Sequence, residues 1–511
     1  MARFSPKIYT LLCGCFAALG SILFSYDLGV IASVLEAPDF LRTTGLEGKD
    51  KQTLNYIGFI TSSMLLGAFV GCIPASLIAD AFSRRIAITV GAAIFLVGGI
   101  LQTAANGKGM MMAGRFFAGI AIGQLSLLAP LYQSEISAFP WHRRGVASWI
   151  GYGVTKNNLG TALQWRLPLG FQMVPAVPLL FVTLVLPESP RWLMIKGREE
   201  ESLTVLAQLH SNGDVHDPLV LGEFHEMREK VREEAATTSG WGQIFRNADN
   251  LRKVMLGVIL QFSVQMTGVS FIQYYAPRVY AAVGYSTETT LLLGSLSGVL
   301  GILSQLSCVL FIDKTGRRWP LIIGNSLSGF LYIFLMWISY KFNKDEGSET
   351  MARAFVAVNW LWNMIFSACI GPISWAYPVE IMNTAIRAKG TALTSMACWI
   401  SNFMIGQVSP DAFAAVGWKY YLLFVICGFT NAFVMWALFP ETRGRTLEEM
   451  DHYFATTHWF VPTAKTDHLD AAARERELIS RELQLDTPVD DGKGDVGGEK
   501  GVAVVREYAE K

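Results

Sequence analysis

An acidic residue interrupts an otherwise apolar run near the start of the sequence. The stretch ILFSYDLGVIA, residues 22–32, places Asp27 among aliphatic and aromatic side chains. A charge in a hydrocarbon interior costs about 2.5–3.5 kcal/mol even on lenient insertion scales. An acid inside a membrane span therefore marks an ion or proton pathway, commonly with a basic partner on another helix.

Arg115 is the predicted partner. If the first helix ends near Glu36, Asp27 lies about 13 Å below the outer surface at 1.5 Å per residue. A helix that enters near Met110 places Arg115 about 8 Å below the same surface. These depths are compatible with a pair in which protonation of Asp27 from outside releases Arg115. A static buried ion pair is the alternative interpretation.

The composition indicates a polytopic membrane protein. The 511 residues are 51% hydrophobic and only 16% charged, and their mean hydropathy is +0.34. Such a chain is too apolar for a soluble multidomain protein. The formal net charge is zero, which gives no reason to expect a nucleic-acid partner. All seven cysteines lie in apolar runs, so we expect buried thiols rather than disulfides or metal ligands.

Eleven apolar runs are long enough to cross a bilayer, which takes about 20 residues each. A twelfth candidate, residues 146–166, is defective because Lys156, Asn157 and Asn158 interrupt it after a short apolar part. An internal deletion, a missing exon or a short re-entrant helix would each explain this. The first run continues past Val30 without a cleavage pattern, so we expect a retained helix. The eleven runs are residues 8–35, 55–79, 86–105, 110–136, 167–186, 254–283, 289–312, 319–341, 354–380, 389–411 and 419–439.

Basic residues crowd four short connectors between these runs. Lys and Arg concentrate on the cytoplasmic side of membrane proteins, so we expect these connectors and both termini to be cytoplasmic. The polar interval 191–253 then forms a cytoplasmic helical bridge. The tail 446–511 ends in a Gly-, Asp- and Lys-rich stretch that cannot support a core and is expected to be disordered. The crowded connectors contain Arg84 and Arg85, Arg143 and Arg144, Lys314 with Arg317 and Arg318, and Arg387 with Lys389.

Short motifs recur in the same order in the two halves of the chain. DAFSRR at 80–85 matches DKTGRR at 313–318, and PESPRW at 187–192 matches PETRGR at 440–445. Between them, SEIS leading to Arg144 matches VEIMNTAIRAKG. Duplicated halves joined by a bridge are typical of transporters. With PLYQSEIS and GVSFIQYYAP, these motifs closely resemble the sugar porter branch of the major facilitator superfamily, and most of all its fungal members.

The resemblance implies an all-α membrane protein with the major facilitator fold. Two six-helix pseudo-repeat halves, 1–190 and 254–445, would flank the bridge, with helix 5 shortened at 146–166. In proton-coupled members an Asp of helix 1 and an Arg of helix 4 match Asp27 and Arg115, so the resemblance implies symport.

Acidic and basic residues cluster at the predicted cytoplasmic helix ends. Opposite charges there can pair between neighbouring helices, and a set that forms only when this side is closed would favour the outward-open state. The alternative is that these charges only set the orientation of the helices at the membrane interface. The resemblance favours a cytoplasmic gate made of such pairs. The clusters are Asp80 with Arg84 and Arg85, Glu135 with Arg144, Glu188 with Arg191, Asp313 with Arg317 and Arg318, Glu380 with Arg387, and Glu441 with Arg443.

The resemblance also implies a substrate site, with fewer side-chain amides than the family usually has. The family's paired glutamine and its amides on helices 8 and 11 align with Val264, Gly301 and Cys398 here. Amides suit sugars because they both donate and accept hydrogen bonds. A helix-to-helix hydrogen bond is the alternative role for a buried glutamine. The candidate substrate residues are Gln261, Gln265, Ser270, Gln273, Tyr275 and Trp375.

The sequence thus predicts a proton-coupled transporter of a sugar or polyol-like solute, working by alternating access. We expect a monomer in the lipid bilayer of the plasma membrane, with solute and protons as partners and without nucleic acid or cofactor. Two alternatives remain open: a nutrient sensor that does not transport, and an inactive product of a truncated gene model. An enzyme is not expected, because no nucleophile, metal or phosphate-loop constellation appears in the sequence.

Overall fold

A computed structural model describes residues 19–20, 23, 25–48, 50–136, 160–181, 186–211, 213–236, 242–445 and 447–462 of the chain. Within these residues the secondary structure consists of helices and turns, without a strand. The predicted all-α class is therefore confirmed.

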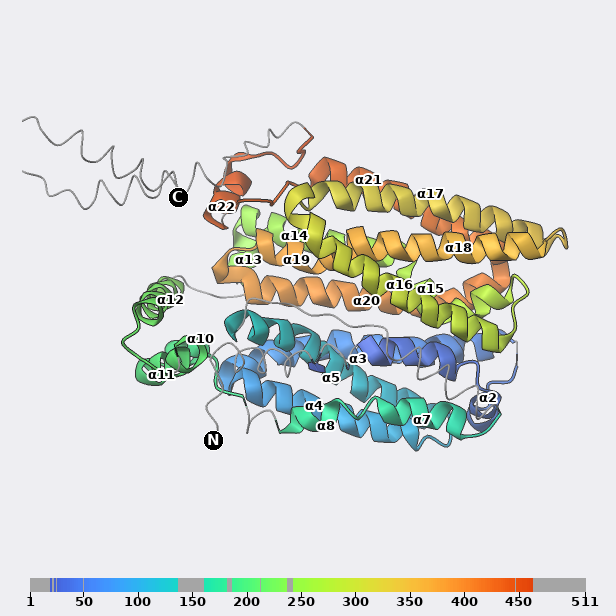
Figure 1. The fold of residues 1–511 in the computed structure, drawn as a ribbon, viewed down its shortest axis with the longest axis horizontal. Helices are drawn as coiled ribbons and strands as arrows, with labels where there is room; N and C mark the ends of the chain where they lie inside the picture. Colours follow the sequence, from blue (N-terminus) through green and yellow to red (C-terminus); the bar gives the residue numbers. More distant parts are fainter. Residues whose placement is uncertain are drawn as a thin grey trace, which may run out of the picture. The chain divides into compact units, whose positions relative to one another are not determined.

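The N-terminal helices form one bundle, drawn in blue and teal in Figure 1. Residues 25–34 are helical, and α5 packs against both α3 and α4. Glycines bring α3 and α5 close together: a Cβ at Gly67 would come within 2.2 Å of the Phe116 carbonyl oxygen. Such small residues allow membrane helices to pack backbone to backbone. The further helices of this bundle are α2 (Pro38–Thr44), α3 (Lys51–Ala81), α4 (Arg84–Thr103) and α5 (Lys108–Ile136).

The C-terminal helices form a second bundle, in which α14 packs against α20 and α17 against α21. The helix pair α14–α15 breaks at Gly268, whose φ is +84°, and a Cβ there would come within 2.2 Å of the Tyr332 hydroxyl. This bundle contains α14 (Ala248–Gln265), α15 (Val269–Ala281), α16 (Thr287–Thr315), α17 (Arg318–Asn343), α18 (Glu349–Ile365), η1 (Phe366–Ile370), α19 (Gly371–Ile381), α20 (Thr384–Val416), η2 (Gly417–Tyr420) and α21 (Tyr421–Leu438).

The two bundles meet along α3 and α20, which lie side by side in Figure 1. The start of α3 faces the end of α20, where Ser62 donates to the Gln407 amide oxygen at 2.8 Å. An ion pair of 3.8 Å between Arg278 and Glu36 also joins the bundles. The connectors at 82–83, 316–317 and 382–383 lie at the opposite end, which we call the basic end because Arg84, Arg317 and Arg387 lie in or near them.

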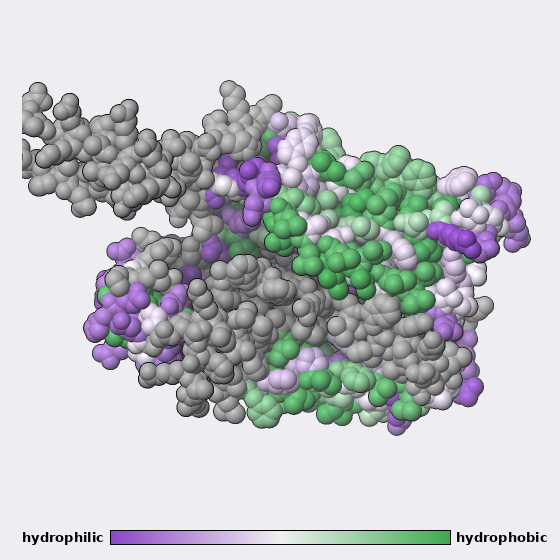
Figure 2. Space-filling view, viewed as in Figure 1, coloured by the Kyte–Doolittle hydropathy of each residue, from purple (hydrophilic) through white to green (hydrophobic). Residues whose placement is uncertain are grey.

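The surface agrees with a membrane protein. Within the described residues, eight helical stretches are long and apolar enough to span a bilayer, and the last, Lys389–Leu438, includes both α20 and α21. Figure 2 shows an apolar band over α16, α17 and α18, with hydrophilic surface toward both ends of these helices. The prediction of six helices in each half is not tested by these stretches and stays a prediction.

The span predicted at 167–186 is not one helix, and this prediction was wrong. The chain forms α7 (Leu163–Phe171), a turn, and then α8 (Ala176–Leu180), both packed on α4. Pro168, Pro175 and Pro178 lie in this stretch, and a proline inside a helix removes a backbone hydrogen bond and clashes with the preceding turn. Of the predicted short helix 5, residues 146–159 lie outside the described residues.

The stretch predicted to be a bridge contains four described helices and a small core of its own. Met194, Leu206, Ala207, Val220 and Phe224 pack together there. The C-terminal bundle starts earlier than the predicted boundary at 254, because α14 begins at Ala248. The bridge helices are α10 (Pro190–Ile195), α11 (Glu199–His210), α12 (Pro218–Ala236) and α13 (Gly242–Arg246).

A short helix after the last span, α22 (Leu447–Thr456), packs on α14 and α19. Arg252 donates to the carbonyl oxygens of Thr457 and His458 at 2.5 and 2.7 Å, and Lys253 pairs with Asp451. Arg252 and Lys253 are only 3% and 1% exposed. We call this set of contacts the α22 clamp.

Candidate functional site

Asp27 and Arg115 form a fully buried ion pair within the N-terminal bundle. Arg115 Nη1 lies 3.3 Å from Asp27 Oδ1, and both side chains are 0% exposed. Arg115 also donates to the Thr61 carbonyl oxygen of α3 at 3.5 Å. The structure therefore brings together the two residues that the sequence singled out for proton coupling.

This pair is incompletely hydrogen-bonded. Within the described part of the chain, Asp27 Oδ2 and Arg115 Nε have no hydrogen-bond partner. Buried ions recover their desolvation cost only when further hydrogen bonds complete their shells. The desolvation cost of this pair is therefore recovered only in part.

A cavity of about 40 Å³ is bounded by α14, α15, η1, α19, α20 and Leu28 of the first helix. Five of the six predicted substrate residues line it: Gln261, Gln265, Ser270, Gln273 and Trp375. Tyr275 is absent from the described lining, because its hydroxyl donates to the Gly406 carbonyl oxygen at 2.8 Å.

Sequence reasoning missed part of the lining, including Phe366, Ser374, Trp399 and Asn402. Asn402 accepts a hydrogen bond from the Tyr274 hydroxyl at 3.0 Å. Asn402 lies four residues after Cys398, so the two side chains share one face of the helix. The position of Cys398 could therefore have identified Asn402 from the sequence.

Most of the polar groups in the cavity wall bind one another. Ser270 donates to the Gln265 amide oxygen at 2.5 Å, and the Gln265 amide nitrogen lies 3.4 Å from Cys398 Sγ. Gln261 donates to the Ser374 carbonyl oxygen at 2.9 Å. The remaining acceptor of Gln261, Oε1, is buried without a partner.

The cavity is narrow compared with a typical ligand site. Pockets for small molecules usually measure about 300–1,000 Å³, whereas this one measures about 40 Å³. Gln273 and Trp375 are partly exposed. A sugar-sized solute therefore needs side chains or helices around this cavity to move apart.

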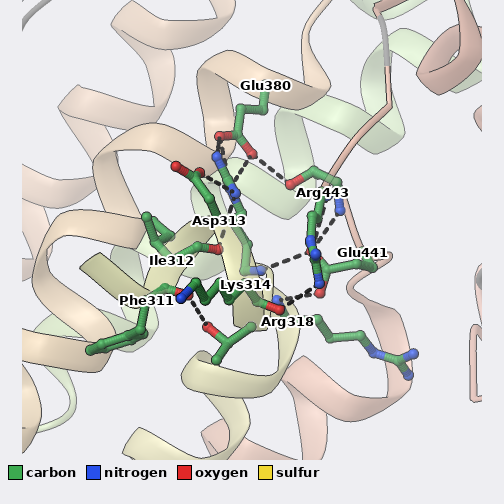
Figure 3. A network of polar contacts seen from close by, with 11 residues as sticks. Phe311, Ile312, Asp313, Lys314, Arg318, Glu380, Glu441 and Arg443 are labelled. Carbon is green, nitrogen blue, oxygen red and sulfur yellow. Dashed lines mark hydrogen bonds and ion pairs between the residues drawn. The ribbon is translucent and has the colours of Figure 1, made fainter. Parts of the chain in front are cut away.

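The acidic and basic residues of the C-terminal bundle converge at its basic end (Figure 3). Arg317 Nη2 lies 3.0 Å from Glu380 Oε1, and Thr442 donates to Glu380 Oε2 at 2.5 Å. Arg317 also pairs with Asp313 at 3.5 Å. We call Asp313, Arg317, Arg318, Glu380, Glu441 and Arg443 the C-terminal charge cluster.

Glu441 is the centre of this cluster. Its carboxylate accepts the backbone N–H groups of Arg317 and Arg318 at 2.8 and 3.1 Å. It also accepts those of Thr442 and Arg443 at 3.0 and 3.1 Å. Hydrogen bonds to an ionised acceptor are stronger than neutral ones. Glu441 therefore ties the start of α17 to the end of α21.

The other predicted gate residues fall into three groups. Arg85 pairs with Glu188 at 2.6 Å in the N-terminal bundle, and Arg387 donates to the Met382 carbonyl oxygen at 3.4 Å. Arg84 is buried and Arg191 is partly buried. Arg144 and the side chains of Asp80 and Glu135 lie outside what the structure describes.

Comparison with known proteins identifies the family. The family model described as sugar (and other) transporter matches residues 13–454. The chain belongs to this family. Its members are integral membrane transporters rather than enzymes, which agrees with the composition and with the resemblance drawn from the motifs.

Fungal proteins are among the relatives. The chain is 33% identical to the MFS glucose transporter mfs1 of Aspergillus flavus, over 96% of this chain and 97% of that protein. It is 31% identical to a high-affinity glucose transporter of Kluyveromyces lactis, over 87% and 85% of the two chains. The alignment with the A. flavus protein runs over 535 positions, so that relative has residues without a counterpart in this chain of 511.

Solved structures confirm the fold. The proton:xylose symporter XylE, bound to 6-bromo-6-deoxy-D-glucose, superposes with a TM-score of 0.71 at 23% identity. The match covers 88% of this chain and 100% of that one. The inward-open form of the same E. coli transporter superposes with a TM-score of 0.69 at 22% identity. The predicted major facilitator fold is thus confirmed.

Proposed function

We propose that the sugar transporter described here couples the movement of a sugar or polyol-like solute to that of a proton, by alternating access. The fully buried and incompletely hydrogen-bonded Asp27–Arg115 pair carries this proposal. An intramembrane acid with a basic partner is typical of proton pathways. The names of similar proteins, which include glucose transporters and a proton:xylose symporter, support the same function.

The proton site and the solute cavity are neighbours along the chain. Leu28 lines the cavity, and Asp27 precedes it directly. A proton on Asp27 removes the negative charge that holds Arg115. Arg115 keeps its hydrogen bond to the Thr61 carbonyl oxygen. The first helix can then shift against α5 without separating opposite charges, and this shift reaches the cavity wall through Leu28.

Alternating access requires contacts that open and close at each end. At the end opposite the basic connectors, Glu36–Arg278 and Ser62–Gln407 join the two bundles and must separate to admit solute. At the basic end, the C-terminal charge cluster and Arg85–Glu188 hold helices within each bundle. We infer that these clusters keep each bundle rigid while the bundles rock.

The topology is part of the proposal. We infer that the basic end and both termini face the cytoplasm and that the protein acts as a monomer in the plasma membrane. The two halves, 1–190 and 254–445, would act as the rocking units with the bridge 191–253 between them. Epitope tags at either terminus should react with antibody only after permeabilisation. Reaction in intact cells would contradict this orientation.

Proton coupling is tested in proteoliposomes that contain the purified chain. With acid outside, labelled glucose or xylose should accumulate above its external concentration, and a protonophore should abolish that accumulation. Uptake that only equilibrates, with the same rate at every pH gradient, would contradict coupling and leave a facilitator.

A further inference from the structure

The cavity offers no counter-ion to a charged solute. None of the fourteen described residues that line it has a charged side chain. Asp27, which precedes the lining residue Leu28, is paired with Arg115. A carboxylate or ammonium group that entered would lose water without gaining a partner, which is strongly unfavourable. The lining therefore fits an uncharged solute.

The cavity also has few free hydrogen-bonding groups. The Gln265 amide is occupied by Ser270 and Cys398, and the Gln261 amide nitrogen is occupied by Ser374. Among the described lining residues, Gln261 Oε1 is a buried acceptor without a partner, and Gln273 adds a partly exposed amide. Asn402 adds a further amide, whose oxygen already accepts from the Tyr274 hydroxyl. A solute with hydroxyls all around its ring would leave several of them unpaired.

Apolar groups make up the rest of the lining. Val264 lies three residues from Gln261 and borders the cavity beside it, and Cys398 presents a thiol rather than an amide or hydroxyl. Leu28 and Val269 add aliphatic surface, while Trp375 adds an aromatic face. A hydroxyl pressed against this surface is desolvated without compensation, whereas a methyl or methylene group is not.

We propose that the solute is an uncharged ring compound with hydroxyls on one edge and a methyl or methylene group on the other, such as a deoxy sugar or a deoxy polyol. The hydroxyl edge would meet Gln261 and Gln273. The apolar edge would meet Val264 and Cys398. This inference rests on the proposed function, because it takes the cavity to be the transport site.

Binding to the purified protein tests the proposal through quenching of tryptophan fluorescence. The probes are D-glucose, its 2-, 3-, 4- and 6-deoxy derivatives, and D-glucuronate. At least one deoxy derivative should bind as tightly as glucose or more tightly, and glucuronate should bind at least tenfold more weakly than glucose.

Two nearly isosteric substitutions sharpen the test. Val264→Thr and Cys398→Ser each add a hydroxyl without changing the shape of the wall. Each should shift the preference from the deoxy derivative toward glucose by about 3- to 10-fold, which is the value of one added neutral hydrogen bond. Val258→Thr, on the same helix but outside the described cavity lining, should leave the preference unchanged.

Three results would overturn the proposal: glucose binding more than tenfold more tightly than every deoxy derivative, no shift in either cavity variant, or no binding by any neutral probe. The binding assay needs no proton gradient. Failure of proton-driven accumulation with the deoxy preference intact would contradict coupling alone. Concentrative uptake together with a preference for glucose would contradict the solute assignment alone.

Discussion

Two arginine–carboxylate contacts in this protein have similar lengths and different surroundings. Arg115 and Asp27 lie 3.3 Å apart with both side chains fully buried. Arg317 and Glu380 lie 3.0 Å apart with side chains 17% and 28% exposed. The first pair leaves Asp27 Oδ2 unsatisfied, whereas both Glu380 oxygens accept hydrogen bonds.

This difference indicates that the two ion pairs have different roles in the protein. A buried pair with missing hydrogen bonds recovers its desolvation cost only in part, so it is held less firmly than a fully hydrogen-bonded pair. A partly exposed cluster with several hydrogen bonds keeps its charges and fixes the helices that carry them. We expect the Asp27–Arg115 pair to change state during transport and the C-terminal charge cluster to maintain geometry.

The largest expected effect is that of Asp27→Asn. A neutral carboxamide cannot take up and release a proton, so concentrative uptake should be abolished while exchange of solute down its gradient persists. Labelled-sugar uptake and counterflow in proteoliposomes measure both. Asp50→Asn is the control, because Asp50 caps α3 through the Thr53 N–H and Asn caps as well. Unchanged accumulation in Asp27→Asn would remove the residue from coupling.

The Asp27–Arg115 pair needs a complete N-terminal half around it, and the short region 146–166 is the predicted weak point of that half. We expect transport by the chain as it stands to be weak, with slow but measurable accumulation of solute. A helix-length apolar insert after Gly145, taken from a fungal relative, should recover folding and uptake. An insert of equal length made of Gly and Ser should not. Monodispersity in detergent and uptake measure the two effects, and robust transport without any insert would contradict this expectation.

Reversal of Arg317 and Arg318 to Glu tests the C-terminal charge cluster. Membrane insertion should stay intact. If the cluster also helps to close the basic end, as the resemblance implies, the population should shift toward the inward-open state, because a few kcal/mol decides most of a two-state balance. Labelling of single cysteines introduced at each end of the cavity measures that shift. An unchanged labelling ratio would limit these arginines to stabilising the C-terminal bundle.

A smaller effect is expected for Glu441→Gln. The amide loses the charge that accepts four backbone N–H groups, so the free energy of unfolding should fall by about 1–3 kcal/mol. The thermal midpoint in detergent measures this loss. Asp313→Asn should have no measurable effect, because that side chain is 82% exposed. Equal midpoints for Glu441→Gln and the parent would show that the cluster does not stabilise the fold.

The smallest effect belongs to Arg353→Ala. Arg353 pairs with Glu349 at the start of α18, but the two side chains are 73% and 79% exposed. Exposed pairs contribute about 0–1 kcal/mol, so stability and uptake should match those of the parent. A loss as large as that of Glu441→Gln would show that exposure does not separate the two kinds of contact.

The sequence predicted those features that depend on local pattern. Apolar length predicted the long helices α3, α4 and α5, and a lone acid in an apolar run led to Asp27 and its partner Arg115. The rule that intramembrane charges need partners can be applied to the sequence alone. The repeated acidic and basic motifs likewise predicted the residues that converge around Arg317.

Features that depend on tertiary contacts were missed. The break between α7 and α8 was signalled by Pro168, Pro175 and Pro178, but apolar length alone favoured one helix. The hydroxyl of Tyr275 turns to the Gly406 carbonyl oxygen, and no residue pattern within α15 signals that choice. The docking of α22 was also missed, because its partners on α14 lie about 200 residues earlier in the sequence.

The α22 clamp has a consequence for biosynthesis. Arg252 and Lys253 are separated from their partners by 205 and 198 residues, and translation adds about 5–20 residues per second. The two cations therefore emerge about 10–40 s before the segment that covers them. In a nascent or prematurely terminated chain both charges lack these partners, so Arg252 and Lys253 become buried only after synthesis has passed the last span.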